Sequence, residues 1–284
     1  MLFAASEGLF GMFGSKKVRF GVVTDLHYAD VAAGGSRHYR LSEQKLLRAM
    51  ETFQREGVDF LIELGDFKDQ ASPPDAAGTL TYLRTIESIF RSFPKPVYHV
   101  LGNHDMDSLT KAEFLENTQN SGLANGKPYY AFRKGPCRFL VLDANFTAEG
   151  SDYSRGNFDW TSAMVPQAQC NWLQAELERS DGPVVLFIHQ LLDGFSTVPK
   201  SVCVKNWLQI VKILEESGKV IAVFQGHHHE GHHSYRQGIH YITHGAMVEG
   251  SISSNCYSIV EIAIEGGKPR ISVEGFGRSG PWVV

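Results

Sequence analysis

Five short polar motifs, each placed directly after an apolar, β-prone segment, constrain this chain of 284 residues more than any other feature. In order they are Asp25-Leu26-His27, Gly65-Asp66-Phe67-Lys68-Asp69, Gly102-Asn103-His104-Asp105, the single His189, and Gly226-His227-His228-His229. In open α/β sheets, ligands bind beyond the carboxyl ends of the strands. A fold that brings these strand ends to one edge gathers carboxylate, amide and imidazole groups there. The pattern therefore predicts a metal site at that edge.

Strand and helix patterns alternate along the chain. Residues are predicted as strands at Val18–Thr24, Asp59–Leu64, Val97–Leu101, Val184–His189, Lys219–Gln225, Gly238–Thr243, Cys256–Ile264 and Ile271–Phe276, as a hairpin at Tyr129–Arg133 and Arg138–Asp143, and as helices at Leu41–Glu56, Thr79–Phe93, Gln167–Ser180 and Val204–Ser217. This alternation is typical of a largely parallel sheet covered by helices. A long loop rich in Gly, Ser, Asp and aromatic residues, at Ala148–Trp160, is expected near the site. Because the chain shows no repeat and no linker, we predict one domain over residues 1–284, with residues 1–16 as an N-terminal arm.

Composition excludes several classes of protein. The net charge of −4 argues against a general nucleic-acid-binding surface, so no nucleic-acid partner is expected. The four cysteines are far apart and form no CxxC pair, which disfavours a zinc ribbon or a disulfide framework. No apolar run approaches the roughly 20 residues that a membrane span needs, and the mildly apolar start has no basic residues before Lys16. We therefore expect a cytoplasmic protein without a membrane association.

The ligand types also define the chemistry. Carboxylate, imidazole and amide groups without a thiolate suit Mn, Fe, Zn or Co, and they do not choose among these metals. A carboxylate can bridge two cations about 3.5–4 Å apart, and such a pair can acidify a bound water that attacks phosphorus. Gly65, Gly102 and Gly226 each precede a candidate ligand, where a tight turn helps to bring the side chain to the sheet edge. Each motif alone could be a structural turn, but all five in order, each after a strand, favour a site.

Together the motifs resemble the calcineurin-like metallophosphoesterase superfamily, whose pattern is D-x-H, G-D-x-x-D, G-N-H-[DE], a later H and G-H-x-H. The resemblance extends from about Val18 to the final strands and has no substitution in any element. It implies an α/β fold, a four-layer αββα sandwich of two mixed β-sheets flanked by helices. It implies one metal held by Asp25, His27, Asp66 and His229, and a second held by Asp66, Asn103, His189 and His227. It further implies that His104 acts as general acid or donates a hydrogen bond to the phosphate, that Asp105 orients His104, and that Asp69 supports the site from outside the ligand set.

A segment shortly after the first motif bears on the substrate. Gly34–Arg40 places Arg37 and Arg40 together with two rings on a loop that should reach the metals. Arginine binds phosphate through paired donors, so both arginines are predicted to bind substrate, although a solvated loop explains them as well. With Tyr28-Ala29-Asp30, Gly226–Gly231 and Met247-Val248-Glu249-Gly250, this segment resembles the manganese-dependent ADP-ribose/CDP-alcohol diphosphatase group. That resemblance implies two divalent metal ions, with manganese favoured over iron or zinc, and a nucleoside-diphosphate substrate.

We therefore expect a binuclear-metal-dependent phosphohydrolase. It would cleave a phosphodiester or phosphoanhydride bond of a nucleotide-like small molecule, such as ADP-ribose or a CDP-alcohol, by attack of a metal-bound hydroxide. The alternative is a phosphomonoesterase or a protein phosphatase, since one scaffold hosts many esters. A non-catalytic scaffold of the same fold would be expected to lose ligands or the equivalent of His104, and none is lost here.

Overall fold

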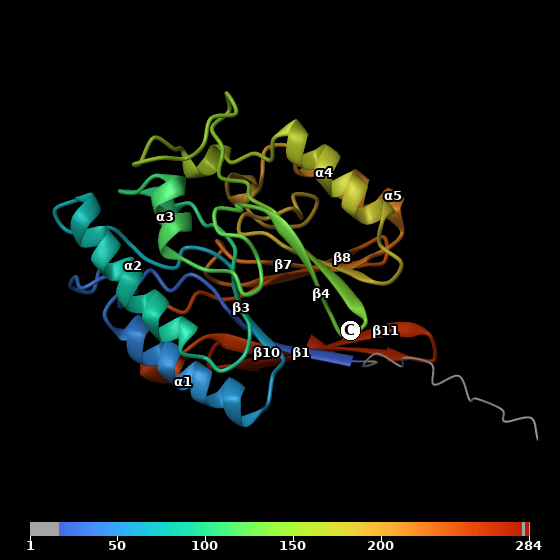
Figure 1. Cartoon of the computed structure of the whole chain (residues 1–284), viewed down its shortest axis with the longest axis horizontal. Coiled ribbons are helices and arrows are strands. Elements are labelled where there is room, and N and C mark those ends of the chain that lie inside the picture. Colours follow the sequence, from blue (N-terminus) through green and yellow to red (C-terminus); the bar gives the residue numbers. More distant parts are fainter. Residues whose placement is uncertain (1–16, 280–281, 284) are drawn as a thin grey trace, which may run out of the picture.

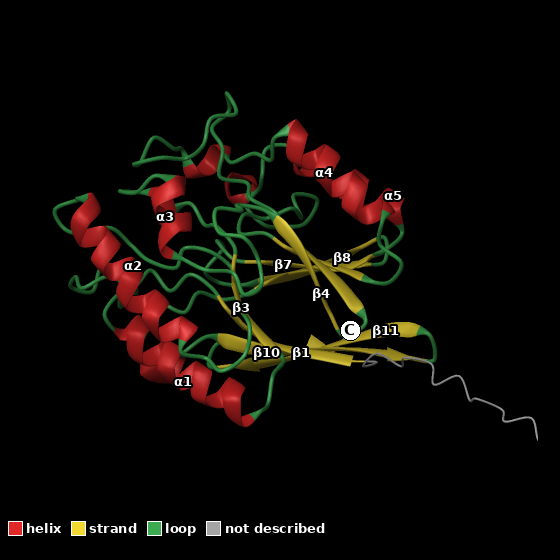
Figure 2. Cartoon of the chain, viewed as in Figure 1, coloured by secondary structure: helices red, strands yellow, loops and turns green. Residues whose placement is uncertain are grey.

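Two six-stranded β-sheets pack face to face with helices on both outer faces (Figure 1, Figure 2). The computed structural model describes residues 17–279, 282 and 283, so the predicted arm at residues 1–16 lies outside the described residues. The strand orders are β12-β11-β10-β1-β2-β3 in the first sheet and β4-β5-β6-β7-β9-β8 in the second. The expected four-layer αββα sandwich of two mixed sheets is confirmed.

The first sheet combines a parallel part with an antiparallel part. The parallel strands are β1 (Lys17–Val23), β2 (Phe60–Glu63) and β3 (Val97–His99), and the antiparallel strands are β10 (Tyr257–Glu265), β11 (Lys268–Phe276) and β12 (Trp282–Val283). Helices α1 (Leu41–Arg55), α2 (Ala76–Arg91) and α3 (Lys111–Asn117) belong to this half of the molecule. The antiparallel strands come from the C-terminal end of the chain, which pairs with β1 at residues far away in sequence.

The second sheet has the same mixed character. Its parallel strands are β5 (Cys137–Val141), β6 (Val184–Phe187), β7 (Val220–Gln225) and β9 (Ile239–Thr243), and the antiparallel strands β4 (Tyr130–Lys134) and β8 (His232–Arg236) form its two edges. Helices α4 (Gln167–Glu178) and α5 (Trp207–Ser217) cover its outer face.

Alternation along the strands builds two kinds of core. Side chains on a strand point to opposite faces in turn, so Phe20 and Phe60 face the second sheet while Leu61 faces helix α1. The rings of Phe20 and Phe60 stack with centroids 4.9 Å apart, and Phe139 of the second sheet meets Phe20 edge-on at 5.7 Å. This aromatic layer joins the two sheets. It fixes their relative position, and therefore the relative position of the loops at their ends.

Some short elements differ from the sequence-based expectation. Residues 232–236 form strand β8, where no strand is predicted. An edge strand needs no apolar alternation on its outer side, which explains the missing signal. Helix α3 was not expected because it has only 7 residues; the capping box of Thr110 and Glu113 starts it.

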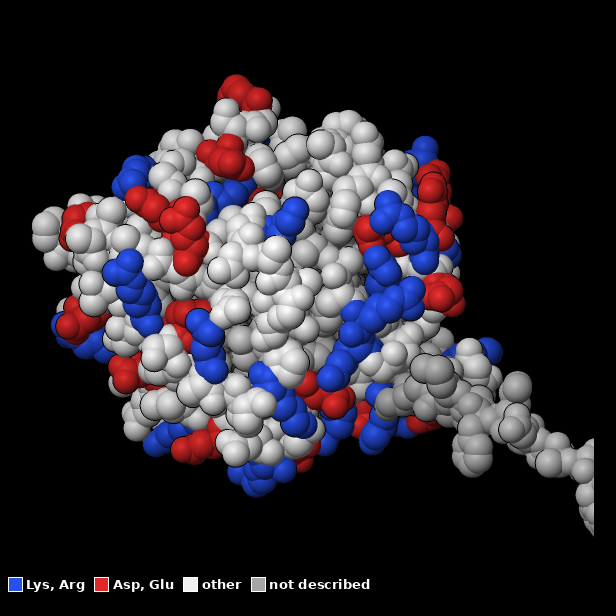
Figure 3. All heavy atoms as spheres, viewed as in Figure 1, with Lys and Arg blue, Asp and Glu red and all other residues white. Residues whose placement is uncertain are grey.

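The surface charge and the helices also bear on expectations from the sequence. On the face in Figure 3, basic and acidic side chains are interspersed. Among the described residues, no helix is both long enough and apolar enough to cross a membrane.

Candidate metal centre

Five strands from both sheets end at the same edge of the sandwich, directly before the predicted ligands. Strands β1, β2 and β3 end ahead of Asp25, Asp66 and Asn103, and strands β6 and β7 end ahead of His189 and His227. Backbone hydrogen bonds then join the loops across strands. The amide of Asp25 donates to the Gly65 carbonyl at 3.0 Å, and the amide of Gly226 donates to the His189 carbonyl at 3.1 Å. The edge is therefore a connected set of loops.

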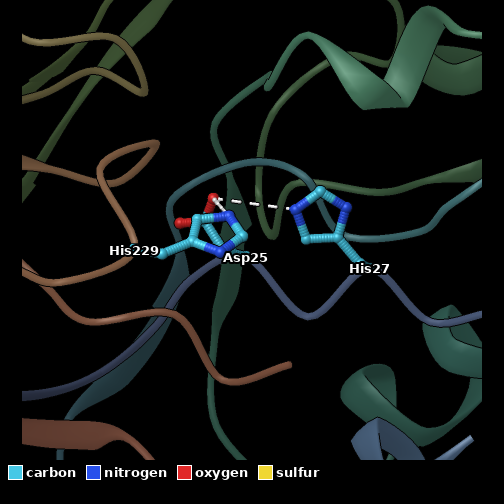
Figure 4. Close-up of side chains that lie close together, drawn as sticks. All are labelled: Asp25, His27 and His229. Atoms are coloured by element: carbon cyan, nitrogen blue, oxygen red, sulfur yellow. Dashed lines mark ion pairs between the residues drawn. The ribbon is translucent and has the colours of Figure 1, made fainter. Parts of the chain in front are cut away.

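The first ligand cluster is formed by Asp25, His27 and His229. Their ligand atoms all lie within 4.8 Å of one another. Oδ1 of Asp25 is 3.3 Å from Nε2 of His229 and 3.9 Å from Nε2 of His27. Figure 4 shows the two imidazole rings turned toward the same carboxylate.

The second ligand cluster contains Asp66, His189 and His227, again within 4.8 Å of one another. Oδ2 of Asp66 is 3.3 Å from Nε2 of His189, which belongs to this cluster. The same oxygen is 3.5 Å from Nε2 of His27, which belongs to the first. One carboxylate oxygen thus lies between the two clusters.

Buried atoms without partners show that the site suits a cation pair. Asp25 Oδ1, Asn103 Oδ1 and the Nε2 atoms of His27, His189 and His227 are buried and have no hydrogen-bond partner within the described part of the chain. Leaving a buried polar atom unpaired costs free energy, so such a group requires an explanation. All five are oxygen or imidazole nitrogen donors, the types that divalent transition metals bind. The residues present therefore fit two divalent ions.

The opposite ring nitrogens of three histidines are held by hydrogen bonds. Nδ1 of His27 is 3.3 Å from Oδ2 of Asp69, Nδ1 of His189 is 2.8 Å from the Leu64 carbonyl, and Nδ1 of His229 is 2.7 Å from Oε1 of Glu249. Such contacts fix the ring orientation and leave Nε2 for a metal. Glu249 was not among the predicted site residues, because it comes from a loop beyond the β8–β9 hairpin.

The backbone is strained where the ligands are. Six non-glycine residues of the described chain have a positive φ, and four belong to the ligand clusters: Asp25 (51°), His27 (44°), Asp66 (55°) and His227 (65°). This left-handed region is unfavourable for residues with a side chain, and it recurs at functional sites where the surrounding structure enforces it. The concentration at this edge is independent support for a site.

The three glycines ahead of the ligands serve mainly to make room. A Cβ at Gly65 would lie 2.5 Å from Nδ1 of His189, and Gly65 also has a φ of 101°. A Cβ at Gly102 would collide with the backbone of Asp66, and one at Gly226 would collide with the hydroxyl of Thr24. From the sequence, these glycines are expected to form tight turns. A left-handed turn requires glycine only at Gly65, whereas the close approach of neighbouring atoms requires it at all three positions.

The electrostatics keep the carboxylates ionised. Burial would raise the pKa of Asp25 and of Asp66, but the neighbouring histidines outweigh burial and hold both pKa values below their usual range. For His189, burial would lower the pKa, yet the charges of Asp66 and Asp25 raise it to about 10. A metal ion bound at Nε2 would replace the proton there, since histidine binds metals in its neutral form. Burial and the charge of His189 together lower the pKa of His227 to about 3.

His104 lies beside the clusters with two carboxylates facing its ring. Its Nδ1 is 3.7 Å from Oδ2 of Asp107 and 4.0 Å from Oδ1 of Asp69. Burial would lower the pKa of His104, but the charges of Asp66, Asp69 and Asp107 raise it to about 9. These carboxylates favour the protonated form of the His104 ring, the form that can donate a proton.

Asp105 occupies a different position from the one expected. Its carboxylate accepts hydrogen bonds from the amides of Gly102 at 2.8 Å, Phe67 at 3.0 Å and Asp66 at 3.2 Å. It thus holds two ligand loops together, while Asp69 and Asp107 face the His104 ring. Sequence reasoning missed Asp107, which also accepts a hydrogen bond from the buried Lys68 at 2.5 Å.

The two predicted substrate arginines separate in the structure. Nε of Arg37 is 3.9 Å from Oε1 of Glu249, the residue that holds His229. Arg40 instead pairs with Asp30 at 2.5 Å, and both side chains are mostly in solvent. The structure therefore brings Arg37, and not Arg40, toward the ligand clusters.

A four-layer sandwich with two linked metal-ligand clusters at one edge is the architecture of a metallophosphoesterase. A model of the calcineurin-like phosphoesterase family matches residues 18–231, and the chain belongs to this family. The family and the ligand clusters together identify a metal-dependent phosphohydrolase.

The chain is also similar to named relatives and to a solved structure. It is 28% identical over 286 residues to the manganese-dependent ADP-ribose/CDP-alcohol diphosphatase of Oryza sativa subsp. japonica, covering 86% of this chain and 87% of the relative. It is 26% identical over 314 residues to the Bos taurus protein of the same name, covering 91% of each. The crystal structure of a dimetal phosphatase from Danio rerio has the same fold, with a TM-score of 0.80, 21% identity and coverage of 94% of this chain and 98% of that one.

Proposed function

We propose that the chain is a manganese-dependent hydrolase of nucleotide-like small molecules that contain a phosphoanhydride or phosphodiester bond, such as ADP-ribose or a CDP-alcohol. The observation that carries the reaction type is Oδ2 of Asp66, which lies 3.3 Å from His189 and 3.5 Å from His27 and so can bridge two ions. The names of the rice and bovine relatives support the substrate class and the choice of manganese.

The ligand roles follow from the two clusters. Asp25, His27 and His229 would hold one ion, and Asn103, His189 and His227 would hold the other, with Asp66 shared. When bound, such a metal pair lowers the pKa of a water and neutralises the phosphoryl oxygens. The protein supplies the fixed geometry, because Asp69, the Leu64 carbonyl and Glu249 hold the histidine rings in place.

His104 would protonate the leaving oxygen. Its Nδ1 faces Asp69 and Asp107, so Nε2 is the nitrogen available to the substrate. The charges of Asp69 and Asp107 beside the ring favour its protonated form, which a general acid requires. Asp69 and Asp107 would act by positioning the ring and stabilising its positive charge.

Arg37 would bind the phosphate that the metals do not hold. A diphosphate carries a second phosphate group, and an arginine recognises it through charge-assisted hydrogen bonds. Arg37 lies next to Glu249 and so reaches the first cluster by way of His229.

A substrate panel tests the proposal. Protein stripped of metal and reloaded with Mn²⁺, Fe²⁺ or Zn²⁺ is incubated with ADP-ribose, CDP-choline, a cyclic nucleotide, a generic phosphodiester and 4-nitrophenyl phosphate. We expect the highest kcat/KM for a nucleoside diphosphate with manganese, and AMP plus ribose 5-phosphate as the products from ADP-ribose. A higher kcat/KM for the monoester than for every diphosphate would favour the phosphomonoesterase alternative.

Two further expectations from the sequence remain predictions. One is that residues 1–284 act as a single domain, and the other is that the protein is cytoplasmic. Limited proteolysis and localisation of the full chain would test them.

A further inference from the structure

Trp160 places a large aromatic side chain in solvent next to a metal-ligand cluster. Its side chain is 45% exposed, and its ring centroid lies 5.8 Å from that of His227 at an interplanar angle of 62°. The other large hydrophobic side chains exposed in the described chain are Leu47, Leu208 and Tyr235, and no ring contact joins any of them to the clusters. A tryptophan contributes a large apolar area, so leaving it in solvent beside a site requires a reason.

The segment that carries Trp160 is held firmly. Asp159 accepts hydrogen bonds from the amide of Thr161 at 2.9 Å and from its hydroxyl at 2.6 Å, which caps the short 3₁₀ helix Trp160–Ser162. The hydroxyl of the buried Tyr153 donates to the Asp159 carbonyl at 3.1 Å. On the other side, the amide of Lys205 donates to the Ala163 carbonyl at 2.8 Å. The backbone that carries Trp160 is therefore fixed before a ligand binds, which lowers the entropy cost of binding against this residue.

The same loop is attached to the segment that carries the proton donor. The amides of Arg155 and Gly156 donate to the carbonyls of Leu109 and Met106, directly after the Gly102–Asp105 motif. The ring of Phe158 stacks on Tyr153 at 4.8 Å and lies 6.5 Å from the ring of His104. The loop therefore borders the site from His104 to His227. Arg37 lies on another side of the site, where it pairs with Glu249, the residue that contacts His229.

We propose that Trp160 is a stacking platform for a planar ring of the substrate, of the nucleobase class, bound beside the second cluster while the phosphates occupy the metal centre. Every base offers a π-face, and tryptophan stacks on such faces without hydrogen-bond readout. The inference rests on the proposed function, because it gives a place to the ring of a nucleotide-like substrate.

Binding of a ligand with a ring and of one without a ring tests the platform. Isothermal titration of manganese-loaded protein with ADP and with pyrophosphate compares the wild type, Trp160→Ala and Trp160→Phe. We expect Trp160→Ala to weaken ADP binding by about tenfold, equivalent to about 1.4 kcal/mol, and to leave pyrophosphate within about twofold. Trp160→Phe should keep most of the affinity for ADP. Tyr235→Ala, which removes an exposed ring elsewhere, is the matched control and should bind both ligands as the wild type does.

Three results would overturn the platform. The first is a wild type that binds ADP no more tightly than pyrophosphate, and the second is a Trp160→Ala protein that binds ADP as tightly as the wild type does. Equal weakening of both ligands together with loss of manganese would make Trp160 a support for His227. The proposed function is judged separately, by turnover of the wild type on the substrate panel. A ring preference in the wild type without cleavage of any nucleoside diphosphate would refute that function and leave the platform standing.

Discussion

Asp66 shows how single residues make this site. Its Oδ1 accepts a hydrogen bond from the amide of His104 at 2.7 Å, and its Oδ2 lies between the two ligand clusters. Its φ of 55° is unfavourable for a residue with a side chain, and the carboxylate of Asp105, which accepts a hydrogen bond from the Asp66 amide at 3.2 Å, helps to hold this conformation. The backbone of Asp66 is therefore strained, and this strained conformation fixes the position of its carboxylate.

At the same scale, His104→Ala should lower kcat by about 10²- to 10⁴-fold while both metals stay bound, because the ring serves the leaving group and not the ions. The loss should be smaller for an ester of 4-nitrophenol, whose leaving group needs no proton. Metal content by mass spectrometry and kcat on ADP-ribose and on the nitrophenyl ester measure this. If the variant lost a metal, His104 would be a ligand; an unchanged kcat would exclude the role of proton donor.

At the scale of elements, neighbouring residues of one loop can lie in different surroundings, one near the site and the other in solvent. The loop between β1 and α1 carries both Arg37 and Arg40, yet only Arg37 contacts Glu249, while Arg40 pairs with Asp30. The chain thus contains a matched pair of arginines within one loop. Because only Arg37 lies near the ligand clusters, comparing variants of the two arginines distinguishes direct phosphate binding from an effect of the loop's net charge.

We expect Arg37→Ala to raise KM for ADP-ribose by roughly ten- to a hundred-fold, since a charge-assisted contact contributes about 1.5–3 kcal/mol. Arg40→Ala removes the same charge from the same loop and should change KM by less than about twofold. Steady-state kinetics of the two variants give the answer. Equal increases in both variants would mean that the loop acts through its overall charge.

A buried ionic group connects three elements behind the site. His99 of β3 lies between Glu63 of β2 and Glu87 of α2, with nitrogen–oxygen distances of 3.4 Å and 3.0 Å. The free carboxylate oxygen of Glu63 accepts the Gly65 amide at 2.5 Å, one residue before Asp66. This group ties the backbone of the Asp66 loop to helix α2.

Removal of one partner from this group should therefore cost stability. We expect His99→Gln to lower the free energy of unfolding by about 3–5 kcal/mol, because it leaves buried carboxylates without their cation. Urea unfolding of both proteins measures the difference. His240→Gln, a change at a half-buried histidine of strand β9, is the control and should have a much smaller effect.

The stabilisation by His99 should also depend on pH. Burial alone would lower the pKa of His99, but Glu87 and Glu63 raise it to about 10, above the 6.5 of an unperturbed histidine. A raised pKa in the folded state means that the contribution of the His99 charge is complete below pH 6.5 and is lost as pH rises toward 10. Burial raises the pKa of its partner Glu63 to about 8, so the charge of Glu63 is complete only above that pH. The gap between wild type and His99→Gln should therefore shrink as pH rises from about 8 to about 10, and a gap that widens over this range would contradict a charged His99.

At the scale of the whole molecule, the sequence predicts the parts of the fold that local patterns encode. The strands before Asp25, Asp66 and His227 are visible because each is an apolar run that ends near a polar motif. The polar edge strand β8 lacks such a pattern. Helix α3 begins at a capping box that the sequence shows, but its seven residues are too few for an apolar period to be recognised.

The site divides in the same way. Its candidate ligands follow from motifs, but their supports depend on contacts between distant segments. Glu249 reaches His229 across 20 residues, and Asp107 meets Lys68 across 39. Asp105 lies next to His104 in the sequence, yet its carboxylate turns to the backbone of another loop. Spacing alone does not encode such tertiary contacts.

The central claim is that two divalent ions share Asp66 at the edge of the sandwich. Anomalous diffraction from crystals soaked in Mn²⁺ tests it most directly. We predict two peaks about 3.5–4 Å apart, one beside Asp25, His27 and His229 and one beside Asn103, His189 and His227, with the Asp66 carboxylate between them. Crystals of Asp66→Asn should show both peaks weakened or lost in an unchanged fold. A single peak in the wild type, or two peaks away from Asp66, would contradict the account.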